Sequence, residues 1–328
     1  MKKVELRYLS QEDIMSLGIG WDDIIERVEM AVSEQANGTI ENPPKRGIHT
    51  RPSAFIHEMP VYLKGMDACG IKWVSGYPEN YKFDLPQILG VQVMNCPETG
   101  VPLAVMDCRW ITAVRTAAAT AVTVKHCARK DSKKIAIIGA GVQGKMHLLA
   151  IKHVLPSLEE CHVCDVKESV LNDYETKMTE QTNVKIKKFM DVSEAVKDVD
   201  IIITCTQKLP KPIIPEGALK PGMLGAGLEA GRAWPESIIH GVDKVITDDL
   251  NQTSSYASTG AFAGGLPEFY AQIGDIVNGK PGRENDDEVI LAFNVGIAAE
   301  DISLGQFVYE KAVEKNLGIV LPLMEKDF

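Results

Sequence analysis

A glycine-rich turn carries the clearest chemical signal in the sequence. Residues 139–144 read Gly-Ala-Gly-Val-Gln-Gly, which is the G-x-G-x-x-G spacing of dinucleotide-binding turns. In such a turn Gly139 permits a sharp change of direction, Gly141 lets the backbone approach a pyrophosphate, and Gly144 lets the next helix pack closely on the sheet. A helix that begins near Val142 would offer free N–H groups and a positive dipole end to the phosphates. We therefore predict a nucleotide site formed by Gly139, Gly141, Val142, Gln143 and Gly144.

The residues around the turn favour a nucleotide site over a chance match. An apolar run precedes the turn at 135–138, a helical stretch follows it, and a second apolar run, Cys161 to Cys164, ends at Asp165. Asp165 lies about 20 residues after Gly144, where a carboxylate accepts hydrogen bonds from the adenosine ribose. A carboxylate there would also repel the 2′-phosphate of NADP. We expect NAD(H) as cofactor, and Lys167 nearby leaves NADP(H) as the alternative.

Arg115 is a charged residue within an otherwise apolar segment. From Thr112 to Cys127 the chain is rich in Ala, Val and Thr, which predicts a buried helix that leads into the nucleotide unit. A guanidinium group is costly to bury without an anionic partner. The sequence leaves two interpretations open, namely an internal salt bridge and a clamp on a substrate carboxylate.

Two polar residues follow the apolar strand that we predict to begin at Asp200. The carboxyl ends of parallel strands face the ligand crevice in open α/β sheets. Thr206 and Gln207, which stand at this end, are therefore candidates for cofactor contacts, with an ordinary polar loop as the equal alternative.

Composition excludes several classes of function. The chain has 328 residues, 45% of them hydrophobic and 24% charged, with a formal net charge of -10, so we expect two domains and no nucleic-acid surface. We find no signal peptide and no apolar stretch of about 18 residues that would span a membrane. The seven cysteines suit a reducing cytoplasm. Cys161 and Cys164 are three apart on a predicted strand and point to opposite faces, so we expect no metal or redox site there.

The order of elements predicts an α/β fold with two parts. Before the arginine helix, Ser10 and Asp13 form a capping box, and two strands, Ile88 to Asn95 and Val101 to Met106, form a hairpin, so this part is mostly an antiparallel sheet with at least one helix. After that helix, strands and helices alternate in the manner of a Rossmann-type domain. We expect residues 251–287 to be mostly loop and Ile297 to Ala312 to form a closing helix.

With these residues in view, the chain resembles the ornithine cyclodeaminase and mu-crystallin family over nearly its full length. The similar segments are Pro44-Lys45-Arg46, Gly70-Ile71-Lys72-Trp73-Val74, Thr112 to Ala118, Ile138 to Gly144, and Asn294 to Asp301. The arginine helix followed by the glycine turn is specific to this family. A generic dinucleotide-binding enzyme would not also have the G-x-K and F-x-x-G-x-A-x-x-D patterns at these positions.

The resemblance implies a domain organisation and a substrate class. Residues 1–115 with 303–328 would form an α+β domain for substrate binding and dimerisation, and residues 116–302 a Rossmann dinucleotide-binding domain. The family also implies NAD(H) or NADP(H), a small amino or imino acid as substrate, and a homodimer.

By resemblance, individual residues receive roles. Arg46, Lys72 and Arg115 would hold the substrate carboxylate, and Val295 would border the substrate. The residues against the cofactor would be Gln87, Arg115, Val142, Gln143, Asp165, Thr206 and Asn294. Three cations that converge on one small pocket repel each other unless an anion joins them, which favours an anionic substrate. Lys72 is also a candidate proton donor or acceptor, with its pKa lowered by the two arginines.

One departure from the family bears on the reaction. Ornithine cyclodeaminases carry an aspartate after the strand that ends at Gly227, where it handles the distal amine of the substrate, and this chain has Leu228 there. Glu229 follows and is a candidate catalytic residue, although neighbours in an extended chain point in opposite directions. Leu228 suits a substrate without a distal ammonium group.

We therefore expect an enzyme that transfers hydride at the α-carbon of a small amino or imino acid, either an imino-acid reductase or an amino-acid dehydrogenase. Two alternatives remain. One is ornithine cyclodeaminase proper, which converts ornithine to proline and ammonia. The other is a mu-crystallin-like protein that binds a ligand with NAD(P)H and has little turnover.

Overall fold

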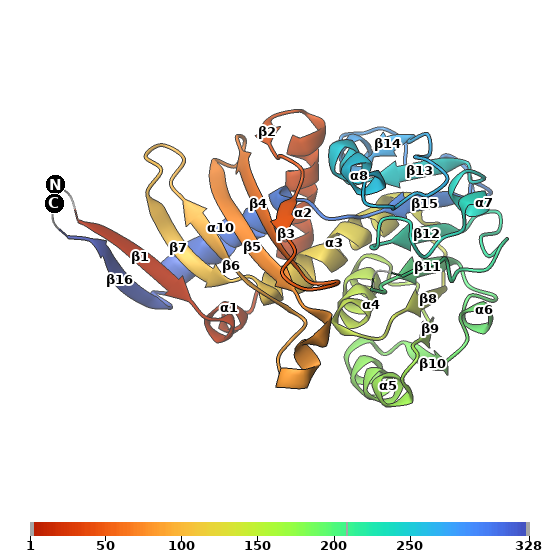
Figure 1. Ribbon diagram of the computed structural model, residues 1–328. Coiled ribbons are helices and arrows are strands. Elements are labelled where there is room, and N and C mark those ends of the chain that lie inside the picture. The colour runs from red at the N-terminus through yellow and green to blue at the C-terminus, as the bar shows by residue number, and fades with distance from the viewer. Residues whose placement is uncertain (1–2, 208, 326–328) are drawn as a thin grey trace. The chain divides into compact units, whose positions relative to one another are not determined.

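The computed structural model describes residues 3–207 and 209–325, which form two compact units (Figure 1). The chain up to Arg115 and the chain from Ile297 onward make the first unit, and Thr116–Gly296 makes the second. The chain thus returns to the first unit at Ile297. The boundary expected from the sequence was residue 303. The physical reason is that the closing helix α10, Ala298–Glu314, is continuous and packs along its length on the first unit.

An eight-stranded sheet is the scaffold of the first unit over the described residues. Its strands are β1 Val4–Leu9, β2 Ile40–Glu41, β3 Arg46–Ile48, β4 Phe55–Leu63, β5 Ala68–Gly76, β6 Ile88–Asn95, β7 Pro102–Asp107 and β16 Ile319–Met324. They follow the order β16-β1-β7-β6-β5-β4-β2, and β3 pairs with β4. All pairs are antiparallel except β1 with β7. The expected hairpin is present as β6 and β7.

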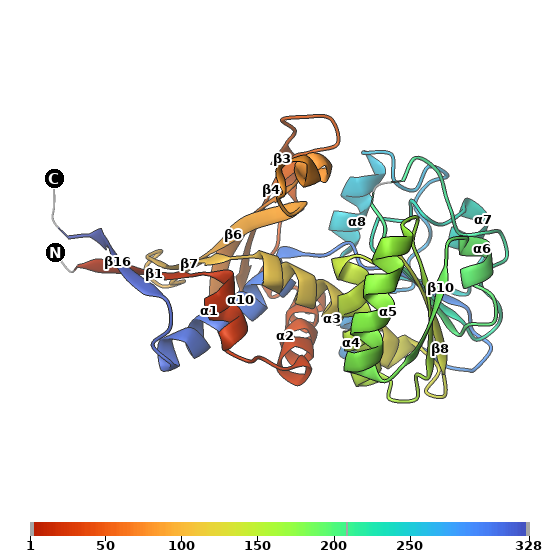
Figure 2. The same ribbon diagram turned by 90° about the horizontal axis from the view of Figure 1, so that it is seen from below.

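Helices cover one face of this sheet. They are α1 Gln11–Ser16, α2 Trp21–Ala36 and α10, and a 3-10 turn, η1, spans Pro78–Phe83. Ser10 caps α1 and forms the expected capping box with Asp13, because its hydroxyl accepts the Asp13 N–H at 3.1 Å while Asp13 accepts the Ser10 N–H at 2.9 Å. Helix α10 packs against α2 and against β4, β5 and β6, as Figures 1 and 2 show. A helix from the C-terminal part therefore closes the core of the N-terminal part.

The second unit is built on a parallel sheet. Its strands are β8 Lys134–Ile138, β9 Glu160–Cys164, β10 Lys185–Phe189, β11 Ile201–Thr204, β12 Leu224–Gly227, β13 Lys244–Thr247, β14 Ala271–Gln272 and β15 Ile290–Phe293. Their order is β10-β9-β8-β11-β12-β15-β13-β14, with every pair parallel. The strand order runs one way across the sheet from β8 to β9 and β10, and the other way from β11 onward, so it reverses between β8 and β11, as in dinucleotide-binding folds. This topology confirms the predicted α/β fold class.

The helices of the second unit include one continuous helix that begins in the first. They are α3 Arg109–Cys127, α4 Val142–Val154, α5 Glu168–Thr182, α6 Val192–Ala195, α7 Glu236–Ile239, α8 Leu250–Ala257 and α9 Ile273–Val277. The expectation that residues 251–287 are mostly loop is confirmed, although the short elements α8, β14 and α9 also lie there. Asp249 starts α8 by accepting the Gln252 N–H, and this short polar helix has little apolar periodicity in its sequence.

No helix of the described residues is long and apolar enough to cross a membrane.

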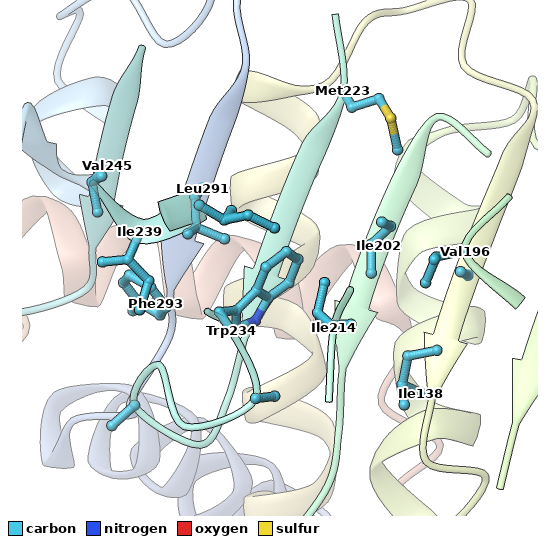
Figure 3. Close-up of a cluster of buried hydrophobic side chains, with 14 of the residues drawn as sticks. Ile138, Val196, Ile202, Ile214, Met223, Trp234, Ile239, Val245, Leu291 and Phe293 are labelled. Carbon is cyan, nitrogen blue, oxygen red and sulfur yellow. The ribbon is translucent and has the colours of Figure 1, made fainter. Parts of the chain in front are cut away.

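Trp234 lies in the middle of an apolar cluster on one face of the parallel sheet, among Ile202, Leu291 and other buried side chains (Figure 3). The indole is 1% exposed, and its Nε1–H donates to the Thr204 hydroxyl at 3.1 Å. A Cβ at Gly225 would stand 2.7 Å from the indole ring. The glycine on β12 therefore makes room for the indole, which in turn fixes the hydroxyl at the end of β11.

Trp234→Ala should lower the free energy of unfolding by about 3–5 kcal/mol, because it leaves a large cavity in a closely packed core. Trp234→Phe should cost clearly less, since the phenyl ring refills most of that volume. Urea unfolding of both variants and of the parent protein measures the difference. Equal losses for the two variants would show that the hydrogen bond to Thr204, rather than packing, accounts for the effect.

Candidate active site

The glycine turn after β8 combines two crowded positions with an open one. Gly139 has a φ of +110°, and a Cβ there would lie 2.6 Å from the Cys205 carbonyl oxygen. A Cβ at Gly144 would overlap the carbonyl oxygen of Gly139. Beside Gly141, by contrast, apart from the adjoining residues of the chain, no described atom lies within 4 Å of the place a Cβ would take. Gly139 and Gly144 are therefore required by the turn itself, while Gly141 borders the space that a pyrophosphate would need.

Asp165 binds the same turn. Its Oδ2 accepts the Ala140 N–H at 3.0 Å, and its Oδ1 accepts the Lys167 N–H at 3.1 Å. A carboxylate offers about four acceptor positions, so these two bonds leave capacity for a ribose. The sequence suggested only a ribose contact, and the structure adds a role in fixing the turn.

Three buried polar atoms of the second unit have no hydrogen-bond partner among the described residues. They are Gln143 Oε1, Thr206 Oγ1 and Glu229 Oε2. Each residue follows one of three adjacent strands, β8, β11 and β12, at its carboxyl end. Buried polar groups are nearly always hydrogen-bonded in native proteins, so these atoms fit a ligand with several donors and acceptors. A dinucleotide, with its ribose hydroxyls and carboxamide, has that chemistry.

A buried polar network holds the first turn of α4. His147 Nδ1 lies 2.7 Å from the Gln143 carbonyl oxygen, which can only accept, so this nitrogen carries the proton. His147 Nε2 then accepts from the Thr120 hydroxyl at 3.0 Å, and Asn294 Nδ2 donates to that hydroxyl at 3.0 Å and to Thr123 at 3.3 Å. Burial lowers the pKa of His147 to about 4, so the ring is neutral near pH 7. The network ties the predicted cofactor residues Gln143 and Asn294 to α3.

His147 was missed in the sequence analysis. The only available signal was a lone histidine four residues after Gln143 in a helical stretch. Such a histidine is common in helices, and its partners come from α3 and from the end of β15, far away in the sequence.

Lys72 and Arg115 meet at one carboxylate of the first unit. Lys72 Nζ lies 2.6 Å from Asp301 Oδ2, and Arg115 Nε lies 2.8 Å from Asp301 Oδ1. Arg115 Nη1 also binds Glu300 Oε2 at 2.8 Å. Lys72 is 1% exposed and Asp301 is fully buried. Of the two interpretations of Arg115, the internal salt bridge is therefore present. A substrate carboxylate would have to bind at the N–H groups of the guanidinium that do not contact Asp301 and Glu300.

Burial and charge shift the pKa values of this cluster in opposite directions. Burial lowers the pKa of the Lys72 ammonium to about 8, an effect that Arg115 strengthens and Asp301 opposes. Burial works to raise the pKa of the Asp301 carboxyl, but the charges of Arg115 and Lys72 outweigh it and hold that pKa below its usual value. Two carboxylates thus balance the two cations. Charge balance alone therefore does not require an anionic ligand at Lys72 and Arg115, and the expectation of an anionic substrate rests on the family resemblance.

Arg46 does not share a face with Lys72. In the antiparallel register Arg46 pairs with Glu58, and Glu58 pairs with Trp73, whereas Lys72 pairs with Met59. Directly paired residues point to the same face of a sheet and neighbours along a strand to opposite faces. Arg46 therefore lies on the exposed face with Trp73, and the predicted convergence of Arg46 with Lys72 and Arg115 is not seen. The sequence could not reveal this, because strand register depends on pairing.

The face of Lys72 has other basic residues that the sequence analysis passed over. His57 pairs with Gly47 on β3 and with Val74 on β5, and its ring stacks on Phe55 with 4.1 Å between centroids. Burial, followed by the charges of Lys45, His49 and Lys72, lowers the pKa of His57 to about 4. The positive charges of Lys45 and His49, which flank β3, therefore act on the face of the sheet that holds His57 and Lys72.

The remaining predicted residues divide between the two units. Gln87 lies just before β6 in the first unit, where its carbonyl oxygen accepts the Tyr77 N–H at 2.8 Å. Val295 and Leu228 lie in the second unit, Val295 within the apolar cluster and Leu228 partly exposed after β12. The Leu228 N–H donates to the Thr204 carbonyl oxygen at 3.2 Å.

Glu229 turns inward toward β11. Its Oε1 accepts the Thr204 hydroxyl at 2.5 Å, while its Oε2 is buried without a partner among the described residues. Burial raises the pKa of the Glu229 carboxyl to about 7, against the lowering effect of the Thr204 hydroxyl and nearby backbone N–H groups. Close to neutral pH this carboxyl can therefore gain or lose a proton.

Residues 5–316 match the model of the ornithine cyclodeaminase/mu-crystallin family. The chain belongs to this family. The match spans strands β1 to β7 of the first sheet from residue 5 onward, the whole parallel sheet and the closing helix α10, so it includes both clusters described above. The resemblance seen in the sequence is thereby confirmed.

Several members of the family are similar over nearly their whole length. The nodulation efficiency protein NfeD of Rhizobium meliloti is 32% identical over 318 residues, covering 96% of this chain and 98% of the relative. A solved structure of Thermococcus litoralis Δ1-pyrroline-2-carboxylate reductase in complex with NADH and L-proline is 33% identical, with a TM-score of 0.86 and coverage of 96% and 99%. An archaeal alanine dehydrogenase dimer with bound NAD is 30% identical, with a TM-score of 0.88 and coverage of 98% and 100%.

Gly141→Ala should abolish or strongly weaken NADH binding in this family member without lowering its melting temperature. The added methyl group meets no protein atom but enters the space left for a pyrophosphate. Gly144→Ala is the matched comparison and should lower the melting temperature, because its methyl group overlaps the backbone of Gly139. Thermal unfolding and NADH fluorescence titration of both variants separate the two effects. Unchanged NADH affinity in a folded Gly141→Ala variant would contradict the assignment of the turn.

Proposed function

We propose that this chain is an NAD(H)-dependent enzyme that transfers hydride at the α-carbon of a small amino acid or its imine. The observation that carries the proposal is the full-length similarity, in sequence and fold, to the pyrroline-carboxylate reductase and alanine dehydrogenase described above. The three unpartnered polar atoms at the ends of β8, β11 and β12 fit the cofactor. Asp165 favours NAD(H) over NADP(H), because its charge would repel a 2′-phosphate.

The bound nicotinamide would supply or accept the hydride. The chain would bind the pyrophosphate of NAD(H) at the N–H groups of Gly141, Val142 and Gln143 and the adenosine ribose at Asp165. Thr206 and Asn294 would contact the nicotinamide nucleotide, since they follow strands in the second half of the sheet.

Lys72 is the proposed proton carrier for the substrate nitrogen. An imine accepts hydride best when protonated, and a lysine whose pKa is about 8 can donate a proton near neutral pH and take it back. Asp301 orients the ammonium through its 2.6 Å contact. Arg115, fixed by two carboxylates, is the proposed clamp for the substrate carboxylate through the remaining edge of its guanidinium group. Arg46 is a weaker candidate than Arg115 for binding the substrate carboxylate, because the strand register places it on the face of the sheet opposite to Lys72.

The residue after β12 argues against cyclodeamination of ornithine. Leu228 is apolar, and Glu229 points toward Thr204 rather than standing in for an exposed carboxylate. We therefore propose a substrate with a short or cyclic apolar side chain. Pyruvate with ammonia, which gives the imine of alanine, and Δ1-pyrroline-2-carboxylate are the first compounds to test.

The purified protein should oxidise NADH, followed by its absorbance, when supplied with one of these two compounds. Lys72→Met should lower kcat by about 100-fold or more with little change in NADH affinity, because the proton carrier is lost. Lys64→Met, at an exposed position after β4, is the control and should retain activity. NADH binding without turnover on any amino or oxo acid would favour a binding protein. Loss of ornithine with no net change in NADH would favour a cyclodeaminase.

We further propose that the chain forms a homodimer through the strands β1 and β16. Strand β16 is exposed along its length, although its sequence is Ile-Val-Leu-Pro-Leu-Met. Ile319, Leu321 and Leu323 are 58%, 45% and 52% exposed. An exposed, apolar edge strand is a site for association. The alanine dehydrogenase relative is described as a dimer.

Replacing Leu321 and Leu323 together by Asp should convert a dimer into monomers, because charges on this strand would have to be buried at the interface. Light scattering coupled to gel filtration measures the mass. Leu250→Asp, at a 41% exposed position on α8 of the second unit, is the matched control and should remain dimeric. A dimer that persists in the double variant would place the interface elsewhere.

A reducing compartment is the proposed location. All seven cysteines are free thiols, and burial raises the pKa of Cys127 and Cys161 to about 12. Free thiols in these numbers suit the cytoplasm.

A further inference from the structure

The carboxyl group of Glu229 is placed for a function that is separate from substrate binding. It follows β12 and turns back under Gly227, with Oε1 bound to the Thr204 hydroxyl at 2.5 Å. The same hydroxyl accepts the indole N–H of Trp234 at 3.1 Å, so the Thr204 proton is directed at the carboxylate. The second oxygen, Oε2, is buried and has no partner among the described residues. The chain therefore fixes one oxygen of this carboxyl group and leaves the other for a ligand.

The position of Glu229 in the sheet selects the part of the cofactor that it would meet. The glycine turn and Asp165 follow β8 and β9, the half of the sheet that binds the adenosine nucleotide in folds of this order. Strands β11, β12, β15, β13 and β14 make up the other half, to which the nicotinamide nucleotide belongs in folds of this order. Thr206, also with a buried unpartnered oxygen, follows β11, the strand next to β12. Glu229 thus lies on the nicotinamide side.

No charged side chain is among the groups that act most strongly on the Glu229 carboxyl. The groups that act on its carboxyl are the Thr204 hydroxyl and the backbone N–H groups of Leu228, Glu229 and Ala233. Cys205 is a titratable neighbour of Glu229, and burial raises the pKa of its thiol well above the usual value, so that this thiol stays protonated. With no cation among these groups, a positive charge on a ligand would be the main electrostatic partner of the carboxylate.

We propose that Glu229 sets the preference of this protein between oxidised and reduced cofactor, its ionised form favouring NAD⁺ and its protonated form favouring NADH. The proposal rests on the proposed function to the extent that NAD(H) must bind at the glycine turn. The nicotinamide ring is positively charged in NAD⁺ and neutral in NADH. A buried carboxylate attracts the former strongly, because the local dielectric constant is low. When the ring is reduced, the carboxyl group loses its partner and takes up a proton from solvent.

The sign of the pH dependence follows from linkage. NAD⁺ stabilises the carboxylate and so lowers the pKa of Glu229 in its complex, while NADH does not. The affinity for NAD⁺ relative to NADH should therefore rise as pH increases through the range around neutrality. A difference of one pKa unit between the two complexes corresponds to a change of about tenfold in that ratio.

The test is a titration of the whole protein with NAD⁺ and with NADH at about pH 6 and about pH 8.5, by calorimetry or protein fluorescence, without substrate. The ratio of the two dissociation constants should shift about tenfold toward NAD⁺ at the higher pH. In Glu229→Gln, whose amide is neutral at both pH values and still accepts from Thr204, the ratio should be independent of pH and close to that of the parent at low pH. Glu194→Gln, on the exposed face of α6, is the matched control and should behave as the parent.

A second pair of variants tests the role of Thr204 as a positioning residue. Thr204→Val removes a donor that lowers the pKa of Glu229, so the midpoint of the pH dependence should move upward. Thr204→Ser keeps the hydroxyl and should restore the parent midpoint. A parent ratio that does not change with pH, or a pH dependence that survives in Glu229→Gln, would overturn the inference while leaving the proposed function intact. Absence of binding of both nucleotides to the parent protein would overturn the proposed function and this inference together.

Discussion

The paired hydrogen bonding of the Asp301 carboxylate to Lys72 and Arg115 is the interaction on which the first unit depends. Asp301 lies in the first turn of α10, where a carboxylate is also favoured by the helix dipole. It joins residues that are 229 and 186 positions away in the chain. Removing one partner of a buried ion pair costs about 3–5 kcal/mol, because a buried charge is left without compensation. The C-terminal helix is therefore needed both for the core of the N-terminal sheet and for the charge state of Lys72.

In the second unit a network of neutral side chains joins the start of α4 to α3 and to the end of β15. His147 is neutral because it is buried. Its ring donates to the Gln143 carbonyl oxygen and accepts from the Thr120 hydroxyl, which in turn accepts from the Asn294 amide. This neutral network fixes the first turn of α4, while the Asp165 carboxylate holds the Ala140 N–H in the glycine turn. The fully connected part of this network rigidifies the site. The unpartnered oxygens of Thr206 and Glu229 mark where the protein leaves bonds for a ligand.

The sequence predicted local features well and pairing poorly. The strand before 139–144, the glycine turn and the helix after it follow from residue type and spacing, which act over a few residues. The opposite faces of Arg46 and Lys72 follow from strand register, which is set by contacts between distant segments. The role of His147 likewise depends on partners from other elements. Within 251–287 the helices are short, so their apolar periodicity was too brief to recognise.

Asp165 combines two tasks, and this limits how the cofactor preference of the protein can be re-engineered. Since its Oδ2 holds the Ala140 N–H in the glycine turn, a small apolar replacement would remove a repulsive charge and also release the loop proposed to bind the phosphates. An asparagine would keep an acceptor for that amide while discarding the charge. Acceptance of NADPH would thus have to come from Asp165→Asn combined with a cation at Val166 or the existing Lys167, both of which are exposed beside it.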